Sequence, residues 1–235
     1  DIIKAGNKQV FFSDANIAPD KKTLTIFLKK LRKIKKERIC WASNISLNLF
    51  EEDTPAFLKE SNCNHVNIGL ESLTTLERKI PSLKFAESII HKLHNVGITI
   101  KACFILGYQE DTERSFEFIK EFIINNGLDF FDIASLVPYP GTKLYNYFKN
   151  NELIKTFDYD RYIIESNKLV TKHPLENYPH LFNNLLFNLY TLKNIYLRFK
   201  NNCLFKKNIS TIFYVLFINL INYFSVMSYK KLQKK

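Results

Sequence analysis

Polar residues follow the apolar stretches of this sequence where strands are expected to end. These strand ends are 13–16 (SDAN), 43–44 (SN), 69–72 (GLES), 107–110 (GYQE) and 138–142 (PYPGT). In parallel α/β proteins, ligands bind beyond the carboxyl ends of the strands. A carboxylate in that position, such as Glu71, forms strong charge-assisted hydrogen bonds. The pattern therefore predicts a ligand site, although Asp14 and Asn16 are also suited to cap the next helix, and Gly107 to turn the chain.

Strand-like and helix-like stretches alternate along the chain and position these strand ends. Apolar runs of strand length lie at 9–13, 39–43, 65–70, 98–106 and 130–137, with helix-like stretches between them at 20–36, 53–62, 82–95 and 111–126. This alternation predicts parallel strands with helical crossovers, in either an open doubly wound sheet or a curved barrel. Five strands are too few for an eight-stranded barrel. Neither a Gly-rich dinucleotide fingerprint nor a P-loop is present, which disfavours a nucleotide-binding open sheet.

The chain divides into a nearly neutral body and a basic extension. We predict an α/β unit over 1–155 and an all-helical extension over 156–235. The net charge of +11 comes from 34 Lys and Arg against 23 Asp and Glu. Nine of the basic residues and no acid lie beyond Glu176, which leaves 25 basic and 23 acidic residues in 1–176. The excess positive charge therefore belongs to the extension, and nucleic-acid binding is not favoured.

The extension contains one stretch with the length of a membrane span. An amphipathic stretch at 181–200 is followed by 21 uncharged residues at 209–229. That length could cross a bilayer, but its Asn, Ser and Thr residues favour a helix that lies on a membrane surface or packs in the core. We expect a cytoplasmic protein in contact with the inner face of the membrane through 193–235.

The sequence predicts no metal site of its own. Cys40, Cys63, Cys103 and Cys203 lie more than twenty residues apart, so none has the spacing of iron–sulfur or zinc ligands. We interpret all four as reduced thiols. The histidines show no ligand spacing either, and His91 and His94 are expected on a solvated helix face.

Five stretches resemble the radical S-adenosylmethionine (SAM) enzymes. They are VFFSDAN (10–16), WAS (41–43), VNIGLES (66–72), FILGYQEDT (104–112) and PYPGTKLY (138–145). The chain is most similar to the branch that usually has an N-terminal cobalamin-binding domain. The resemblance covers about residues 1–155, and YLRF at 196–199 weakly resembles the branch's C-terminal extension.

The resemblance implies a partial (β/α)6 barrel of which this chain carries strands two to six. It implies SAM and a [4Fe–4S] cluster as cofactors, with cobalamin in members that use it, and a flavodoxin-type electron donor. The cluster cysteines of the family, C-x3-C-x2-C, follow the first strand, so we expect them outside this chain, upstream of Asp1. The only Met is Met227, which agrees with a piece of a longer polypeptide. The chain alone is therefore expected to be inactive.

The implied activity is reductive cleavage of SAM to a 5′-deoxyadenosyl radical. In this branch the radical chemistry leads to methylation or rearrangement, here of a small or lipid-like molecule. Carried over to this sequence, Glu71 and Ser72 would contact SAM, with Ser43 as a further polar contact. Gly107 would let the backbone approach the adenine, and Asp14 and Asn16 would face SAM or substrate. The alternative for Glu71 is an ion pair with Arg78 or Lys79.

Three other functions stay open. A methylthiotransferase acting on tRNA predicts a C-terminal RNA-binding β-barrel, whereas the extension is predicted to be helical. A non-catalytic relative would keep the barrel as a binding scaffold without the cluster. A membrane-bound interaction protein would be defined by the extension.

Overall fold

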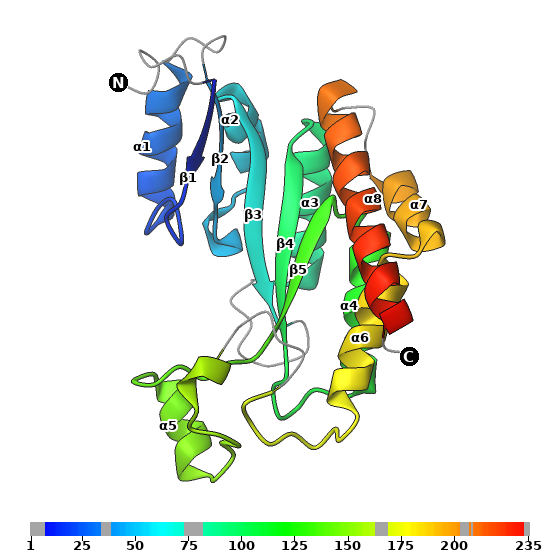
Figure 1. The fold of residues 1–235 in the computed structure, drawn as a ribbon. Helices are drawn as coiled ribbons and strands as arrows, with labels where there is room; N and C mark the ends of the chain where they lie inside the picture. Colours follow the sequence, from blue (N-terminus) through cyan, green and yellow to red (C-terminus); the bar gives the residue numbers. More distant parts are fainter. Residues whose placement is uncertain are drawn as a thin grey trace.

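The computed structural model describes residues 8–33, 39–72, 82–162, 169–202, 207 and 209–232. Within these residues, five strands form one parallel sheet in the order β1-β2-β3-β4-β5. The strands are β1 (Gln9–Phe12), β2 (Cys40–Asn44), β3 (Cys63–Glu71), β4 (Thr99–Leu106) and β5 (Phe130–Ser135). Every predicted strand is present, and the predicted parallel α/β fold is confirmed (Figure 1).

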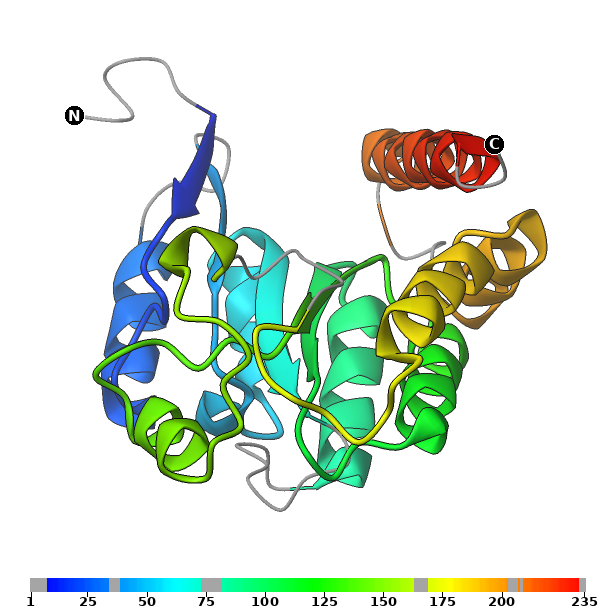
Figure 2. The same cartoon turned by 60° about the horizontal axis from the view of Figure 1, so that its bottom comes forward.

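Four helices connect the strands and cover one face of the sheet. They are α1 (Lys21–Arg32), α2 (Thr54–Glu60), α3 (Leu83–Asn95) and α4 (Glu113–Asn125), with the short 3-10 turn η1 (Leu47–Leu49) after β2. Figure 2 shows α3 and α4 on the same side of the sheet. Apolar side chains of all four helices pack with those of the strands in one continuous core.

Side-chain caps explain where these helices begin. The Asp20 carboxylate accepts a hydrogen bond from the Thr23 amide at 2.7 Å, and the Ser82 hydroxyl accepts one from the Phe85 amide at 3.0 Å. Each cap satisfies a backbone N–H that has no partner inside the helix. Asp20 caps α1, so the alternative interpretation of Asp14 and Asn16 as its caps is wrong.

The two faces of the sheet differ in character because side chains alternate along a strand. On β3, Val66, Ile68 and Leu70 are fully buried against the helices. The residues between them, including His65 and Asn67, lie on the opposite face and are partly exposed. We call this opposite side the open face of the sheet.

A second, smaller unit follows β5. It contains α5 (Lys143–Asn150), the 3-10 turn η2 (Tyr159–Arg161) and an antiparallel bridge between Ile154 and Thr171. Its apolar side chains form a separate cluster around Tyr145 and Phe148. In Figure 1 this unit lies beyond the carboxyl ends of the strands.

The C-terminal extension is helical in its described part and packs against the body. Its helices are α6 (Tyr178–Leu189), α7 (Leu192–Asn201) and α8 (Ile209–Leu232). The stretch 181–200 thus forms parts of two helices, because the Thr191 hydroxyl accepts a hydrogen bond from the Asn194 amide and begins a new helix. Phe182 and Leu185 of α6 belong to the same core as the sheet.

A buried polar cluster joins the extension to the body beside the amino end of β5. Asp129 is fully buried, and its carboxylate contacts His94 at 3.2 Å, Lys207 and the amide group of Asn202 at 3.1 Å. His94 is therefore buried, and the prediction that it lies on a solvated helix face is wrong. That prediction rested on the i, i+3 spacing to His91, which is exposed, and the spacing does not reveal the distant partner Asp129.

Burial sets the charge states in this cluster. Desolvation lowers the pKa of His94 despite its hydrogen bond to Asp129. Burial alone would raise the pKa of Asp129, but the hydrogen bond from His94 and the charge of Lys207 outweigh it, and the pKa lies below its usual range. The cluster at neutral pH is a neutral imidazole and a buried Lys–Asp ion pair.

Candidate functional site at the carboxyl ends of the strands

The loop after β1 is fixed to the end of β2. The Asn44 side chain donates a hydrogen bond to the Asp14 carbonyl at 2.7 Å, and the Asn16 side chain accepts one from the Ser46 amide at 3.1 Å. The Ile17 amide also donates to the Asn44 carbonyl at 3.0 Å. The structure thus brings the predicted residues Asp14 and Asn16 to one edge of the sheet, with the Asn16 side chain holding the backbone.

Glu71 ends β3 in an unusual backbone conformation. Its φ of +55° lies in the left-handed region, which costs a residue with a side chain about 1 kcal/mol or more. The pairing of β3 with β4 shifts register between Gly69 and Glu71. The Glu71 carboxylate lies over Gly69, because a Cβ on Gly69 would be only 2.8 Å from Oε1. A glycine at 69 thereby makes room for this carboxylate.

The Glu71 carboxylate forms no ion pair with any residue that the structure describes. Arg78 and Lys79, its alternative partners, lie outside the described residues. A carboxylate placed beyond a strand in this way is able to accept hydrogen bonds from a ligand's hydroxyl or ammonium group.

The two predicted serines are both buried. Ser72 follows Glu71 directly and is 3% exposed. Ser43 is fully buried, and its hydroxyl lies 3.1 Å from the Phe12 carbonyl and 3.3 Å from the Asn44 carbonyl. Ser43 therefore links β1 to β2 on the helix side of the sheet, away from the open face.

Gly107 begins a tight turn held by a carboxylate. Its φ is +106°, and its amide donates to Asp111 Oδ2 at 2.7 Å. The Tyr108 amide donates to the same oxygen at 3.0 Å. A Cβ on Gly107 would lie 2.6 Å from Leu169 Cδ2, so a neighbouring side chain occupies the space that a glycine leaves here. The sequence analysis placed Asp111 only at the start of the helix-like stretch 111–126, and its role in the turn was missed.

The segment that begins at 169 crosses the end of β4. His173 Nε2 lies 2.7 Å from the Tyr108 carbonyl, and the Leu175 amide donates to His173 Nδ1 at 3.0 Å. A carbonyl only accepts and an amide N–H only donates, so both bonds require the neutral tautomer with the proton on Nε2. Gln109 adds a bond to the Lys172 carbonyl at 2.7 Å. The loop after β4 is therefore rigidly held.

A chain of polar side chains crosses the open face of the sheet. His65 Nδ1 lies 2.8 Å from Thr99 Oγ1, and His65 Nε2 lies 2.8 Å from Asn67 Oδ1. Asn67 Nδ2 in turn donates to Asn44 Oδ1 at 2.8 Å. With the bond from Asn44 to Asp14, this chain connects β4, β3, β2 and the loop after β1. Desolvation lowers the pKa of His65 and favours its neutral form.

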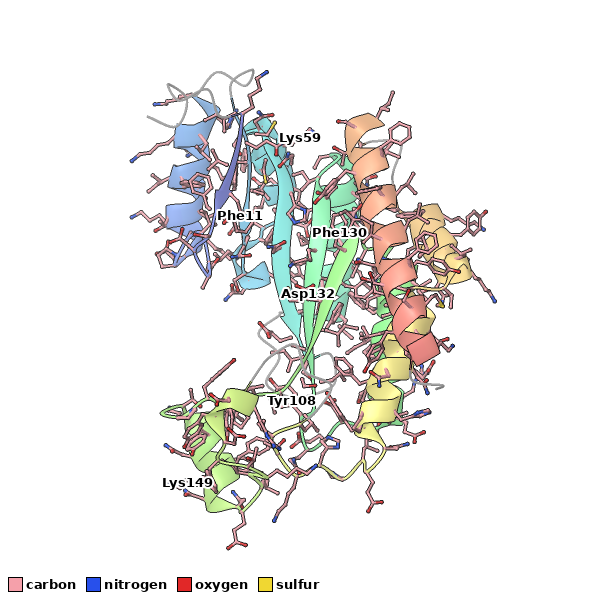
Figure 3. All side chains as sticks on the ribbon, in the orientation of Figure 1. Phe11, Lys59, Tyr108, Phe130, Asp132 and Lys149 are labelled. Atoms are coloured by element: carbon pink, nitrogen blue, oxygen red, sulfur yellow. The ribbon has the colours of Figure 1, made fainter. Side chains whose placement is uncertain are left out.

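An ion pair continues the open face across β4 and β5. Lys101 Nζ lies 2.6 Å from Asp132 Oδ2. Figure 3 shows Phe130 and Asp132 on the face of β5 that is turned to the viewer, and Tyr108 beyond the lower end of the sheet. The prediction missed this polar face. Its signal is the alternation of polar with apolar residues along β3 and the first half of β4, at His65, Asn67, Thr99 and Lys101.

The described cysteines do not fit an iron–sulfur cluster. Cys63 is buried, and burial raises the pKa of its thiol. Burial also raises the pKa of the Cys103 thiol, to about 11. Cluster ligands are thiolates gathered around one metal centre, and no group of three potential metal ligands occurs among the described residues. Cys203 lies outside them.

The sequence is similar to two methyltransferases. It is 31% identical over 188 residues to bacteriochlorophyllide d C-12(1)-methyltransferase from Chlorobaculum tepidum, which covers 74% of this chain and 40% of the relative. It is 28% identical over 157 residues to bacteriochlorophyllide d C-8(2)-methyltransferase from the same organism, covering 64% of this chain and 34% of the relative. The chain thus spans less than half the length of these relatives. No protein-family model matches it.

One solved structure shares the fold. It is the radical SAM methyltransferase TsrM from Kitasatospora setae with cobalamin and a [4Fe–4S] cluster bound. It matches with a TM-score of 0.53 at 14% identity, over 64% of this chain and 30% of TsrM. The chain has the fold of a radical SAM enzyme. The predicted fold class, a partial barrel of this type followed by C-terminal helices, is therefore confirmed.

Proposed function

We propose that this chain is the SAM- and substrate-binding part of a radical SAM methyltransferase. The observation that carries the proposal is a radical SAM fold in a chain that is 31% identical to a methyltransferase. The polar open face and the polar strand ends agree with a small-molecule site at that edge. Because the described cysteines do not fit a [4Fe–4S] cluster, the proposal places the cluster ligands outside this chain and expects this chain alone to be inactive.

Glu71 is proposed as the main contact to SAM. Its carboxylate lies at the carboxyl end of β3 without an ion-pair partner among the described residues, and Ser72 lies next to it. In this role the carboxylate accepts hydrogen bonds from the ribose hydroxyls or the ammonium group. The loop with Asp14 and Asn16 lies on the same edge and faces SAM or substrate. Gly107 and Ser43 instead support the neighbouring backbone.

The proposed reaction is methyl transfer to a small or lipid-like molecule. Both methyltransferase relatives act on a bacteriochlorophyllide, and the TsrM structure contains cobalamin and a [4Fe–4S] cluster. We extend both cofactors to the whole protein to which this chain belongs, together with a flavodoxin-type electron donor. A cluster held outside this chain would supply the electron for cleavage of SAM. Rearrangement of the substrate is the alternative outcome.

A non-catalytic scaffold is the second candidate function. It is favoured by the lack of a cluster site among the described residues. A tRNA methylthiotransferase is not favoured, because the described part of the extension forms helices and not a β-barrel.

The test uses the full-length protein that contains this chain, purified anaerobically with a reconstituted cluster. We expect SAM-dependent formation of 5′-deoxyadenosine or S-adenosylhomocysteine, and none from this chain alone. Glu71→Gln should raise the KM for SAM by roughly tenfold to a hundredfold, since a hydrogen bond to a charged group contributes about 1.5–3 kcal/mol. Glu152→Gln is the matched control, because Glu152 has the same φ of +55° and is exposed.

Two results would contradict the proposal. If the full-length protein with an intact cluster turns over no SAM, the scaffold function replaces it. If Glu71→Gln and Glu152→Gln have the same KM for SAM as the unchanged protein, Glu71 does not contact SAM.

A further inference from the structure

Helix α8 is attached to the body along its inner face. Val215 is fully buried and Asn219 is 2% exposed. Asn219 Nδ2 donates to the Asp129 carbonyl at 3.2 Å, and its Oδ1 accepts from Arg198 Nη2 at 2.7 Å. Farther along the helix, Asn222 donates to the Tyr190 hydroxyl at 3.2 Å. Lifting α8 from the body would leave these buried polar groups without their partners, which is costly.

Arg198 strengthens this attachment. It is fully buried, and its guanidinium lies 5.0 Å from the Phe131 ring centre and 5.8 Å from that of Tyr190. Burial lowers its pKa to about 10, so it stays charged at neutral pH and needs its polar partners. Asn219 of α8 is one of these partners. If α8 left the body, the buried Arg198 guanidinium would lose its hydrogen bond to Asn219, and this cost keeps α8 in place.

The opposite face of α8 is apolar and exposed. The outer stripe consists of Phe213, Phe217, Leu220, Ile221 and Phe224, whose exposed fractions are 67%, 61%, 42%, 44% and 64%. The spacing of these residues places them on one side of the helix. A contiguous exposed apolar surface of this kind marks an interaction site. Figure 1 shows α8, in red, on the outside of the molecule beside β5.

The charges that follow the outer stripe in the sequence have one sign. Residues 209–229 contain no charged group, and Lys230, Lys231, Lys234 and Lys235 follow. No acid lies anywhere beyond Glu176. Lysines that follow an apolar helix in the sequence complement an anionic surface. They disfavour a second copy of this chain as the partner, because it would bring the same uncompensated positive charge to the interface.

We propose that the outer stripe of α8 docks on an anionic membrane, with the helix lying in the plane of the bilayer. The stripe enters the boundary between headgroups and acyl chains, and the lysines that follow contact lipid phosphates. The length and apolarity of Ile209–Lys230 would also allow a membrane span. The hydrogen bonds of Asn219 to the body exclude a span in this arrangement. The docking does not depend on the proposed enzymatic function.

Docking would place one edge of the candidate site against the membrane. Tyr214 of α8 contacts Phe130, with ring centres 6.0 Å apart, and Phe130 lies on the open face of the sheet. Phe130 in turn contacts His65 at 6.0 Å between ring centres. The open face therefore begins next to the surface that binds the bilayer.

The test is co-sedimentation of the whole chain with vesicles of phosphatidylcholine, with and without phosphatidylglycerol. We expect binding to the anionic vesicles that salt weakens, because headgroup contacts are screened. Phe217→Glu should lower the partition coefficient by about tenfold or more, since it replaces an apolar ring that would enter the bilayer with a charge. Phe157→Glu is the matched control, because Phe157 is 59% exposed and lies outside α8. Circular dichroism establishes that both variants fold.

Lysine variants and two further measurements complete the test. Lys234→Gln with Lys235→Gln should lower anionic-vesicle binding by roughly fivefold for each charge removed. Equal binding of Phe217→Glu and Phe157→Glu would overturn the proposal. So would equal binding to both kinds of vesicle, or a dimer by sedimentation equilibrium that binds no vesicles. Resistance of membrane-bound protein to carbonate extraction would show a span and overturn in-plane docking.

Discussion

Substitution of Gly107 by Ala tests how the turn after β4 is built. Gly107 has a φ of +106°, which costs a residue with a side chain about 1–3 kcal/mol. The new Cβ would also lie 2.6 Å from Leu169 Cδ2, well inside the ordinary carbon–carbon contact distance of about 3.5–4.0 Å. Moving Leu169 adds the cost of overpacking, so we expect the free energy of unfolding to fall by roughly 2–4 kcal/mol.

Gly141→Ala separates the cost of backbone strain from the cost of the close contact. Gly141 also has a positive φ, of +86°, but nothing lies within 4 Å of an added Cβ. It should therefore cost only the backbone strain of about 1–2 kcal/mol. The double variant Gly107→Ala with Leu169→Ala should recover about 1 kcal/mol relative to the sum of the single changes, because the close contact disappears.

Urea unfolding followed by circular dichroism measures the unchanged protein, the three single variants and the double variant. The reasoning is refuted if Gly107→Ala is no more destabilising than Gly141→Ala and shows no coupling with Leu169→Ala. The space beside Gly107 would then be free for a ligand, as expected from the resemblance to radical SAM enzymes.

Three further predictions concern buried groups. Asp111→Asn should lower the free energy of unfolding by about 1–2 kcal/mol in urea, since two amides lose a charged acceptor. The pKa of His94 is lowered in the folded state, so its contribution to stability is present above about pH 6.5 and is lost as pH falls, because the unfolded chain takes up the proton first. His94→Gln should therefore flatten the fall of the melting temperature between about pH 7 and 5. An unchanged slope would contradict this prediction. Cys103, with its pKa of about 11, should react with iodoacetamide at neutral pH roughly a hundredfold more slowly than free cysteine, as peptide mapping would show; equal rates would mean an accessible thiolate.

The sequence was sufficient to predict the parallel α/β fold because its signals are local. Apolar runs of strand length alternate with capped helices, and Asp20 and Ser82 cap helices in the structure. The break between α6 and α7 was harder to predict, since the apolar periodicity continues across Thr191. The hydroxyl of Thr191 begins the new helix there. This single cap is a weak signal in the sequence compared with the apolar periodicity on either side.

The positions of the strand ends were predictable, whereas their role as a ligand site stays a prediction. The strand ends with Asp14 and Glu71 were predicted from residue type and position. The turn carboxylate Asp111 was missed as part of the site because its partners depend on the path of the loop. His94 was misplaced, since its partner Asp129 is 35 residues away in the sequence and only the fold brings them together.

The coding sequence upstream of the Asp1 codon, translated in frame, tests the central claim most directly. If the chain is part of a radical SAM enzyme, that sequence encodes a strand followed by cysteines spaced C-x3-C-x2-C. The claim is contradicted if a start codon lies just upstream and no such cysteines precede Asp1, because the fold would then lack the ligands of its cluster.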